Sequence, residues 1–412
     1  MKKKVWIFNH YATDTMLDHG GRHYWFAKYL TRAGYDVRIF CASTVHDTDI
    51  NFDVGKSGYC EKKVDGVKYT LIETSNYVGN GKSRVKNMYQ YYRRIFRVVK
   101  NYEKPDVILA SSVHPLALQA GLKISKKLGV KCICEIRDLW PESLVEYNII
   151  PRNHIITKLM YRGERRLYKK AESLIFTIPG AGKYISDRGW EKDVPKEKIY
   201  NINNGIDLEV YNANKLNKTL EDSDLEDERF KKVLYTGSLR AANKPENFID
   251  LAERLAEVSG NIKIIIYGGG DQLEILRSKV KEKSLENIVF KGRVDKEYIP
   301  FILSKGDLNL MDGDIGGLSK YGISGNKLFD YIASGKPVIM DCEENEFGII
   351  NSNQIGIAKH FANQKEMAVT IADMLNGDKK RYNLWCENAK ALTLEYDFKR
   401  LTDKLIEIIE NK

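Results

Sequence analysis

The chain has 412 residues, of which 43% are hydrophobic and 30% are charged, and its formal net charge is +10. This length suffices for two domains with full cores, and the composition is that of an ordinary globular protein. No run of about eighteen apolar residues occurs, so the sequence predicts no transmembrane helix. The positive charge favours a polyanionic partner or a membrane surface.

The six cysteines are scattered along the chain. Only Cys132 and Cys134 lie close together, and no second pair completes a metal site. We therefore expect reduced thiols and a cytoplasmic location.

The first part of the chain alternates apolar strands with helices. Residues 5–9, 36–41, 67–72 and 105–110 predict strands, and residues 22–33 predict a helix between the first two. A loop over residues 10–21 ends in Gly20 and Gly21. Strand, glycine turn, helix and strand form the opening unit of a doubly wound fold. The glycine pair either makes a tight turn or lies against a ligand.

Residues 82–104 form a basic, aromatic segment with a single acid, Glu103. Apolar residues recur there at three- and four-residue steps, namely Tyr89, Tyr92, Ile95, Phe96 and Val99. The pattern predicts an amphipathic helix that either docks on anionic lipid or packs on a sheet with a solvated basic face. A second basic stretch, residues 152–170, predicts a helix that could share the membrane surface. We expect no nucleic-acid partner, because no nucleic-acid-binding module is visible.

Polar residues follow several predicted strands of this first half. His10 follows the first strand, His114 follows the strand at 105–110, and Arg137 and Asp138 follow a strand at 130–136. Parallel α/β sheets bind ligands at the carboxyl ends of their strands, so these side chains are candidates for contacts with a ligand. The alternatives are a structural hydrogen bond for His114 and a simple ion pair for Arg137 and Asp138.

The second half repeats the pattern with strands at 232–235, 263–267, 287–290 and 307–311. Arg240 and Lys244 follow the first of these, and both suit phosphate oxygens, although two solvated cations are the alternative. The pattern Asp312-Gly313-Asp314 imitates a metal motif, but we discount it because it directly precedes a phosphate-type helix. We expect the acidic stretch 221–228 to be a flexible loop.

Residues 320–341 organise the second half. A polar, glycine-rich loop leads into a helix over 327–334, Gly335 ends the helix, and a strand follows at 338–340. A helix N-terminus carries unpaired N–H groups and suits a phosphate. Lys327 adds a positive charge, and Asp330 could accept hydrogen bonds from a pair of sugar hydroxyls.

This stretch resembles the nucleotide-sugar site of the retaining glycosyltransferases of family 4, which have the GT-B fold. Residues 333–339 match the family's A-x-G-x-P-V-I string, and Asp330 takes the place of its ribose-binding glutamate. Gly322 stands where the family has a sugar-facing glutamate. The string E-x-R-D-L-W-P-E at 135–142 resembles an O-antigen and capsule branch that transfers N-acetylated hexoses and deoxyhexoses.

The resemblance implies an α/β protein with two Rossmann-like domains facing a cleft. Residues 1–205 would form the acceptor side, residues 206–385 would bind the nucleotide sugar, and residues 386–412 would be helices packing back on the first domain. The implied reaction moves a sugar, with retention, from a UDP-linked, N-acetylated donor to a polyprenyl-diphosphate-linked saccharide in bacterial surface-polysaccharide synthesis. The enzyme would then lie on the inner face of the cell membrane.

The resemblance also implies roles for individual residues, and it implies a reaction that requires no metal or other cofactor. His114, Arg240 and Lys244 would be catalytic, and His10, Arg137 and Asp138 would contact the acceptor or the donor sugar. The implied donor-binding residues are Gly20, Gly21, Gly237, Gly268, Arg293, Val294, Ser324, Asn326, Lys327, Leu328 and Asp330.

Two other functions stay open. A nucleotide-sugar 2-epimerase has the same fold and would need paired carboxylates near the sugar carbons. A non-catalytic protein that binds a saccharide or a lipid carrier is the other alternative, because the sugar-facing glutamate is replaced by Gly322.

Overall fold

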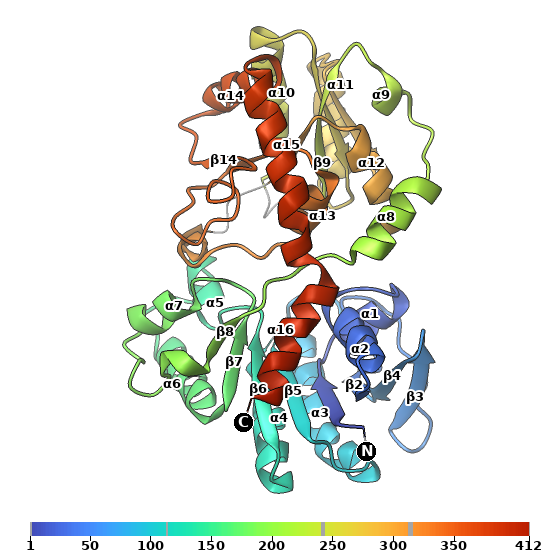
Figure 1. Cartoon of the computed structure of the whole chain (residues 1–412), viewed down its shortest axis with the longest axis vertical. Helices are drawn as coiled ribbons and strands as arrows, with labels where there is room; N and C mark the ends of the chain where they lie inside the picture. Colours follow the sequence, from blue (N-terminus) through green and yellow to red (C-terminus); the bar gives the residue numbers. More distant parts are fainter. Residues whose placement is uncertain (1, 113, 240–243, 312–315, 412) are drawn as a thin grey trace. The chain divides into compact units, whose positions relative to one another are not determined.

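The computed structural model describes residues 2–112, 114–239, 244–311 and 316–411 (Figure 1). The chain divides into two compact units. The first comprises Met1–Asn203 and Phe398–Lys412, and the second comprises Asn204–Asp397. Each is an α/β unit with a mostly parallel sheet, as the sequence predicts.

The first unit contains a sheet in the order β3-β4-β2-β1-β5-β6-β7-β8, in which only β3 is antiparallel to its neighbour. The central strands are buried on both sides, which explains their continuous apolar runs. The strands are β1 (Lys4–Phe8), β2 (Asp36–Ala42), β3 (Tyr59–Val64), β4 (Val67–Ile72), β5 (Val107–Ser112), β6 (Lys131–Ile136), β7 (Ser173–Phe176) and β8 (Ile199–Asn201).

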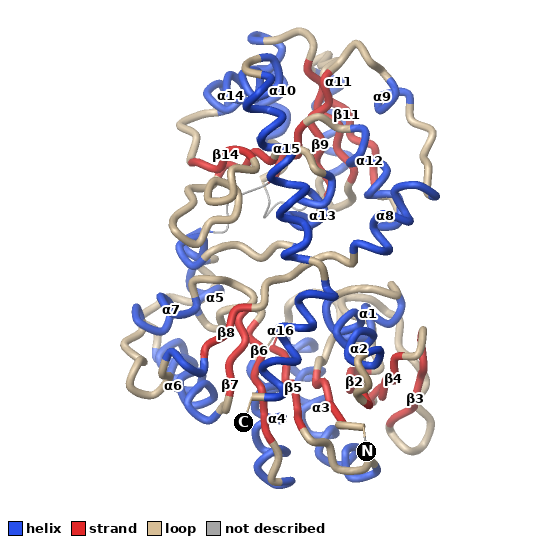
Figure 2. Tube along the Cα trace, viewed as in Figure 1, coloured by secondary structure: helices blue, strands red, loops and turns tan. Residues whose placement is uncertain are grey.

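Helices cover both faces of this sheet (Figures 1 and 2). One layer is α1 (Ala12–Leu17), α2 (Arg22–Arg32) and α16 (Phe398–Glu410), and Leu401 and Leu405 of α16 share a core with Ile7 and Ile39. The other layer contains α3 (Lys82–Val98), α4 (Pro115–Leu128) and α6 (Ile155–Lys170). The short helices α5 (Glu142–Glu146) and α7 (Ala181–Asp187) flank α6 in the chain.

The second unit contains a parallel sheet in the order β11-β10-β9-β12-β13-β14. Along β10, Ile264 and Ile266 enter one core and Ile265 the other, as the two-residue period of a strand requires. The strands are β9 (Lys231–Thr236), β10 (Ile262–Tyr267), β11 (Ile288–Gly292), β12 (Leu308–Met311), β13 (Val338–Asp341) and β14 (Gly356–Lys359).

Helices also pack on both faces of the second sheet. The helices α10 (Asn247–Val258) and α14 (Gln364–Asn376) share one core, whereas α8 (Leu208–Asn217), α12 (Ile299–Lys305) and α13 (Asn326–Ser334) contribute to the other. The remaining helices are α9 (Ser223–Glu226), α11 (Leu273–Glu282) and α15 (Lys379–Thr393).

Several expectations about elements need correction. Residues 10–21 contain the helix α1 and are not only a loop. The acidic stretch is not a free loop either, because Asp222 pairs with Lys291 at 2.6 Å and Asp224 pairs with Lys263 at 2.6 Å. Residues 386–397 belong to the second unit, and the return to the first begins at Phe398. The physical reason is that α15 packs on α13, where Ala389 is fully buried.

The amphipathic helix at 82–104 is shorter than predicted, and most of its apolar side is used inside the fold. Tyr91 and Ile95 are fully buried, and Val99 is 7% exposed. Only Val85 and Tyr89 are exposed large hydrophobic residues of α3, at 62% and 54%. The apolar side of α3 therefore packs inside the first unit, which is the second of the two predicted possibilities, and the basic side of α3 lies at the surface. None of the helices in the described ranges combines the length and apolar character that spanning a membrane requires.

Candidate functional site

In the second unit, two glycine turns cross at the carboxyl end of the sheet. The Gly237 N–H donates to the Tyr267 carbonyl at 3.0 Å. A Cβ added to Gly268 would lie 1.8 Å from the Gly237 oxygen, and one added to Gly270 would lie 2.2 Å from the Leu239 oxygen. Glycine is therefore required at these positions by backbone packing, and the expected approach to a nucleotide stays a prediction.

Lys327 is held beside this crossing, in the first turn of α13. Its Nζ lies 3.0 Å from the Tyr235 hydroxyl and 4.4 Å from the centre of the Tyr235 ring. A Cβ on Gly237 would come within 2.7 Å of the same ammonium, so Gly237 makes room for it. The helix end at Gly325 has no side-chain cap. An ammonium and an uncapped helix N-terminus thus meet at one glycine turn, which is an arrangement suited to a phosphate.

Asp330 lies about one helical turn beyond Lys327 on α13. Within the described residues, its carboxylate has neither a hydrogen-bond nor an ion-pair partner, although its backbone carbonyl accepts from the Tyr211 hydroxyl at 3.4 Å. Burial raises the pKa of the Asp330 carboxyl group, against the opposing charge of Lys296. A carboxylate left without partners can accept two hydrogen bonds from a diol.

The neighbouring Tyr331 fixes this helix to the sheet. Its hydroxyl accepts a hydrogen bond from the Thr236 N–H at 2.9 Å, at the end of β9. The helix that carries Lys327 and Asp330 is therefore tied to the strand that leads to Gly237.

Two of the predicted donor-binding residues make contacts within the second unit. Leu328 is 1% exposed and belongs to the core under α13, because it lies on the inward side of the helix. Ser324 is engaged by Asn204, whose N–H donates to the Ser324 hydroxyl at 3.1 Å and whose side chain donates to the Ser324 carbonyl at 2.7 Å. The side chain of Leu328 is thus excluded from the site, and Ser324 anchors the chain where the second unit begins.

The other predicted site residues of this unit differ in their exposure and their contacts. Asn326 and Arg293 are exposed, and Val294 packs against the core. Lys244 has a positive φ of 46° and lines a cavity of about 490 Å³ together with Phe248. Arg240 and Asp312-Gly313-Asp314 lie outside the described residues.

In the first unit, the structure brings His10 and His114 together, as candidates from two different strand ends. Their ring nitrogens Nδ1 and Nε2 lie 2.7 Å apart, and each residue is 1% exposed. The His10 ring stacks between Tyr11 and Tyr91, with centroids 4.4 and 4.7 Å away. Burial lowers the pKa of His114 to about 3, so it is neutral at ordinary pH. Its buried Nδ1 has no hydrogen-bond partner among the described residues and can bond a ligand hydroxyl.

Arg137 and Asp138 lie beside this pair at the end of β6. The guanidinium of Arg137 forms no hydrogen bond or ion pair with the described residues, so the alternative, a simple ion pair with Asp138, is not made. Part of Asp138 is exposed, yet the surrounding protein raises the pKa of its carboxyl group. Both side chains are therefore available to a bound molecule.

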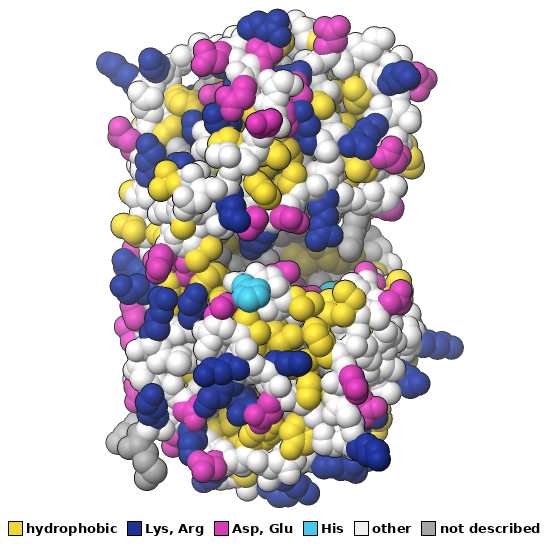
Figure 3. Space-filling view, turned by 90° about the vertical axis from the view of Figure 1, so that its right-hand side faces the viewer, with side chains coloured by type: hydrophobic (Ala, Val, Ile, Leu, Met, Phe, Trp, Pro, Cys, Tyr) yellow, Lys and Arg dark blue, Asp and Glu magenta, His cyan; other side chains and the backbone are white. Residues whose placement is uncertain are grey.

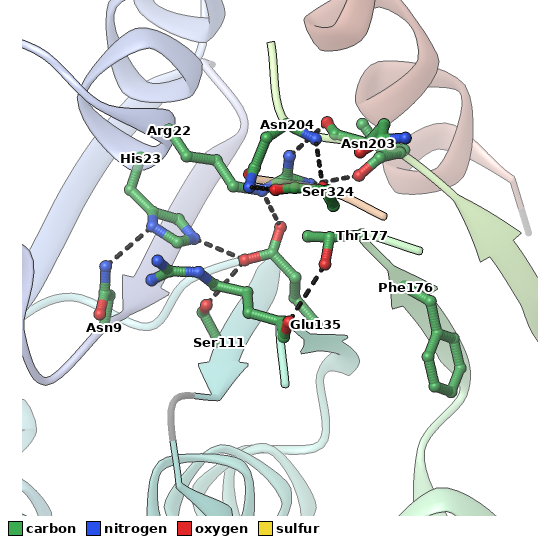
Figure 4. Close-up of polar contacts among 12 residues, drawn as sticks. Asn9, Arg22, His23, Ser111, Glu135, Phe176, Thr177, Asn203, Asn204 and Ser324 are labelled. Carbon is green, nitrogen blue, oxygen red and sulfur yellow. Dashed lines mark hydrogen bonds and ion pairs between the residues drawn. The ribbon is translucent and has the colours of Figure 1, made fainter. Parts of the chain in front are cut away.

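A buried ionic network that the sequence analysis missed lies below these residues (Figure 4). Glu135 accepts from Arg22 Nε at 2.7 Å and from Ser111 at 2.7 Å, and it contacts His23 Nε2 at 2.7 Å. Arg22 also donates to the carbonyls of Ile202 and Asn203. Burial opposes ionisation, but Arg22 and His23 hold the pKa of Glu135 well below its usual range. The available signal was a lone acid in the apolar strand at 131–136.

Arg84 is a second residue whose contacts the sequence did not predict. The sequence predicts it on a solvated or membrane-facing helix, but its Nε donates to the Tyr11 hydroxyl at 3.2 Å. Its charge also lowers the pKa values of His10 and His114, after the larger effect of burial. Arg84 thus adds positive charge to this edge of the first unit.

Gly20 and Gly21 connect α1 to α2. Gly21 has a φ of 83°, a left-handed conformation, and a Cβ there would lie 3.0 Å from Thr15 Cγ2. The tight turn by itself accounts for Gly21, and the predicted contact with a donor stays a prediction. No cluster of three or more His, Cys, Asp and Glu residues that could hold a metal ion occurs within the described ranges.

Comparison with known families identifies the class of protein. Residues 24–210 match the model for glycosyltransferase family 4, and residues 217–392 match that for glycosyl transferases group 1. The two matches follow each other and together cover most of the chain. The chain is a glycosyltransferase of the GT-B type, similar to family 4. The curated proteins include no significant match.

Solved structures agree with this fold. Sucrose-phosphate synthase from Thermosynechococcus elongatus is 14% identical with a TM-score of 0.68, over 99% of this chain and 98% of that one. Anabaena Alr3699/HepE, solved with UDP and glucose, is 15% identical with a TM-score of 0.62, over 100% of both chains. A Listeria monocytogenes protein described as a UDP-N-acetylglucosamine 2-epimerase is 13% identical with a TM-score of 0.62, over 100% of this chain and 96% of that one.

Proposed function

We propose that this glycosyltransferase moves an N-acetylated sugar, with retention, from a UDP-linked donor to a polyprenyl-diphosphate-linked saccharide. The observation that carries the donor part is the pairing of Lys327, beside an uncapped helix end, with the unpartnered carboxylate of Asp330 one turn further on. The first group suits a diphosphate and the second suits a ribose diol. Anabaena Alr3699/HepE, which shares the fold, was solved with UDP.

The proposed chemistry follows from where charge develops. The bond between the sugar carbon and the diphosphate oxygen breaks, and the acceptor oxygen bonds to that carbon from the same face. The proton of the acceptor hydroxyl passes to the departing diphosphate. Lys327 and the first turn of α13 stabilise the negative charge that grows on the diphosphate in the transition state. His114, through its free Nδ1, would orient a hydroxyl of the sugar.

The deciding experiment is a donor screen that measures nucleoside diphosphate release with and without a lipid-linked saccharide. Lys327→Met should lower turnover by about a hundredfold, as loss of one charge-stabilising group does. Lys279→Met, which removes an exposed lysine on α11, is the matched control. Release of an epimerised donor without transfer would support the 2-epimerase alternative, and an absence of any conversion would support a non-catalytic binding protein.

We also propose peripheral binding to an anionic membrane through the layer of α3 and α6. Large apolar side chains are exposed near the start of α6, with Ile155 at 63%, Ile156 at 52% and Leu159 at 54%. Lys158 and Arg162 are exposed on the same helix, and Arg93 and Arg97 are exposed on α3. Apolar side chains with flanking cations are typical of interfacial binding.

This membrane proposal predicts binding to liposomes that contain anionic lipid, weakening as salt screens the charges. Ile155→Ser with Ile156→Ser, and separately Arg93→Glu with Arg97→Glu, should each reduce co-sedimentation. Lys279→Glu on α11 provides the control. Co-sedimentation that is indifferent to lipid charge and unchanged in both double variants would contradict the proposal.

A further inference from the structure

A groove runs between α4 and α6 on the first unit, and it reaches the candidate sugar-contact residues described above at Asp138. Its volume is about 730 Å³, which lies within the usual range of roughly 300–1,000 Å³ for ligand pockets. The apolar residues along it include Leu116, Leu122, Met160 and Leu167. All residues that line it belong to the first unit.

The groove has two chemically different ends. Ser112, Asp138 and Trp140 lie at one end, where β5 and β6 finish and where His114 is placed. Hydroxyl and carboxylate groups beside an aromatic ring can bind a saccharide through its hydroxyls and its apolar ring face. This end meets the edge of the sheet at which the first unit gathers its other candidate sugar contacts.

Four cations line the other end, namely Lys123, Lys126, Arg166 and Lys170. Lys123 donates to the Tyr92 hydroxyl at 2.7 Å. The remaining three are exposed and form no ion pair with the described residues. Glu172 is the acid at this end, so the positive charges outnumber it and leave a net attraction for an anion.

Glu164 also lines the groove, but it contributes little negative charge. It is 5% exposed and accepts hydrogen bonds from Tyr168 at 2.7 Å and from Tyr184 at 2.8 Å. Burial raises its pKa to about 8. At neutral pH the carboxyl group is therefore mostly protonated, and it does not oppose an anion nearby.

Gly163 lines the groove and contributes no side chain to it. It lies in the middle of α6, where glycine is unfavourable by roughly 0.5–1 kcal/mol relative to alanine. A Cβ at this position would meet no atom within 4 Å, and its φ is not left-handed. Neither crowding nor backbone conformation requires glycine here, and its missing side chain leaves free space along the groove.

We propose that this groove binds the acceptor as a saccharide that carries a phosphate or diphosphate. The acceptor hydroxyl lies at the end with Asp138 and Trp140, and the phosphate lies at the end with Lys126, Arg166 and Lys170. The rise of about 1.5 Å per residue places Lys126 roughly 16 Å along α4 from Pro115, which is longer than one sugar ring. This inference rests on the proposed function, because it supplies the acceptor site of the same reaction.

The first test isolates the cationic end. Inorganic diphosphate is titrated into the full chain while UDP saturates the donor site. Lys126→Glu with Arg166→Glu should weaken diphosphate binding by about tenfold or more, because two charge-assisted contacts are lost. Lys279→Glu with Lys281→Glu, on exposed positions of α11, should leave it unchanged. Equal affinities in wild type and in the Lys126/Arg166 variant would overturn the proposal.

The second test fills the middle of the groove. Gly163→Leu, and to a lesser degree Gly163→Ala, should weaken the binding of N,N′-diacetylchitobiose diphosphate. Gly182→Leu is the control, since Gly182 is an exposed glycine of α7 with equally open surroundings. Thermal unfolding checks that each variant is folded, and Gly163→Ala serves if the leucine variant is not. Unchanged binding in a folded Gly163 variant would contradict the proposal.

The third test separates the two sources of such an acceptor. The same disaccharide diphosphate is compared with and without a farnesyl chain, in detergent, as an acceptor and as a ligand. Preference for the farnesyl form identifies a lipid-linked acceptor, and equal use of the two identifies a free sugar phosphate. UDP binding, measured on every variant, keeps the two proposals distinct. A failure of UDP to bind contradicts the donor site, whereas normal UDP binding with no effect of the groove variants contradicts only the acceptor site.

Discussion

At the scale of single residues, burial decides which charges are available for chemistry. Glu135 is buried with Arg22 and His23 and is committed to them, whereas Asp330 is crowded by protein but has no partner among the described residues. Binding sites often contain an ionisable group that is desolvated and has no charge partner. This contrast makes Asp330, and not Glu135, the candidate for binding a ligand.

The raised pKa of Asp330 gives a prediction for pH. Ribose hydroxyls donate to the ionised carboxylate, so UDP affinity should be constant above the raised pKa and should fall as the pH drops through it. Asp330→Ala should weaken binding more than Asp330→Glu does, because glutamate keeps both acceptor oxygens. Calorimetry with UDP over the acid range, with Asp330→Asn to account for titration of the nucleotide, measures this. A wild-type pH profile that matches that of Asp330→Asn would show that Asp330 is structural.

Glu164 gives a second prediction, for stability. Its pKa is raised to about 8 in the folded chain from an ordinary value of 4.5. Between these values the folded state binds more protons than the unfolded state, so stability should fall as pH rises, by at most about 1.4 kcal/mol per pH unit. Glu164→Gln should remove this component and flatten the dependence. Urea denaturation from pH 5 to pH 8 tests it, and identical slopes in the two proteins would contradict it.

At the scale of elements, the buried network joins α2 to β6 and to the last residues of the first unit before residue 204. Arg22 reaches both Glu135 and the carbonyls of Ile202 and Asn203, so one side chain connects three segments. Asn9 extends the network, because its side chain contacts His23 Nδ1 at 2.8 Å. Such a fully bonded cluster fixes the edge of the sheet that carries the candidate sugar contacts.

Removal of one partner from this network should be costly. Glu135→Gln leaves the Arg22 charge buried without its carboxylate and should destabilise the first unit by about 3–5 kcal/mol. The lowered pKa of Glu135 means that its contribution is present above the ordinary glutamate pKa and is lost as the pH falls through the folded value. Urea denaturation of Glu135→Gln, Arg22→Met and the double variant gives the coupling energy. Strict additivity of the two changes would contradict the network.

At the scale of the whole molecule, each unit is a mostly parallel sheet covered by helices, with its candidate residues at the carboxyl ends of the strands. The formal net charge of the chain is +10. On the face shown in Figure 3, the Lys and Arg side chains do not form one continuous basic patch but lie among acidic and apolar side chains. Total charge is therefore a weak guide to the partner. The partner is better indicated by where the cations lie, namely near the exposed apolar residues of α6 and along the groove between α4 and α6.

The overall chemistry predicts transfer without a divalent metal. Lys327 and the N-terminus of α13 supply positive charge for the departing diphosphate, and this is the usual alternative to a metal ion. Activity should therefore persist in EDTA. Initial rates with and without chelator measure this, and abolition by EDTA with recovery in manganese would show that a metal ion is needed.

The sequence by itself determined the class of fold and the existence of most elements. Continuous apolar runs predicted the buried parallel strands. Gly335 ends α13 in the left-handed conformation, as the sequence predicts. The loop and helix at 320–335 also predicted Lys327 and Asp330, because a phosphate-binding helix end is a local feature of the chain.

Only the tertiary structure decided which side of a helix is free and which distant residues meet. Periodicity gives α3 an apolar side but cannot show that the sheet already covers it. It cannot show either that His10 meets His114, 104 positions away, or that Glu135 meets Arg22, 113 positions away. The groove between α4 and α6 likewise exists only when the two helices pack on one sheet. These features depend on contacts between segments far apart in the chain, whereas sequence patterns report on neighbours within a few turns.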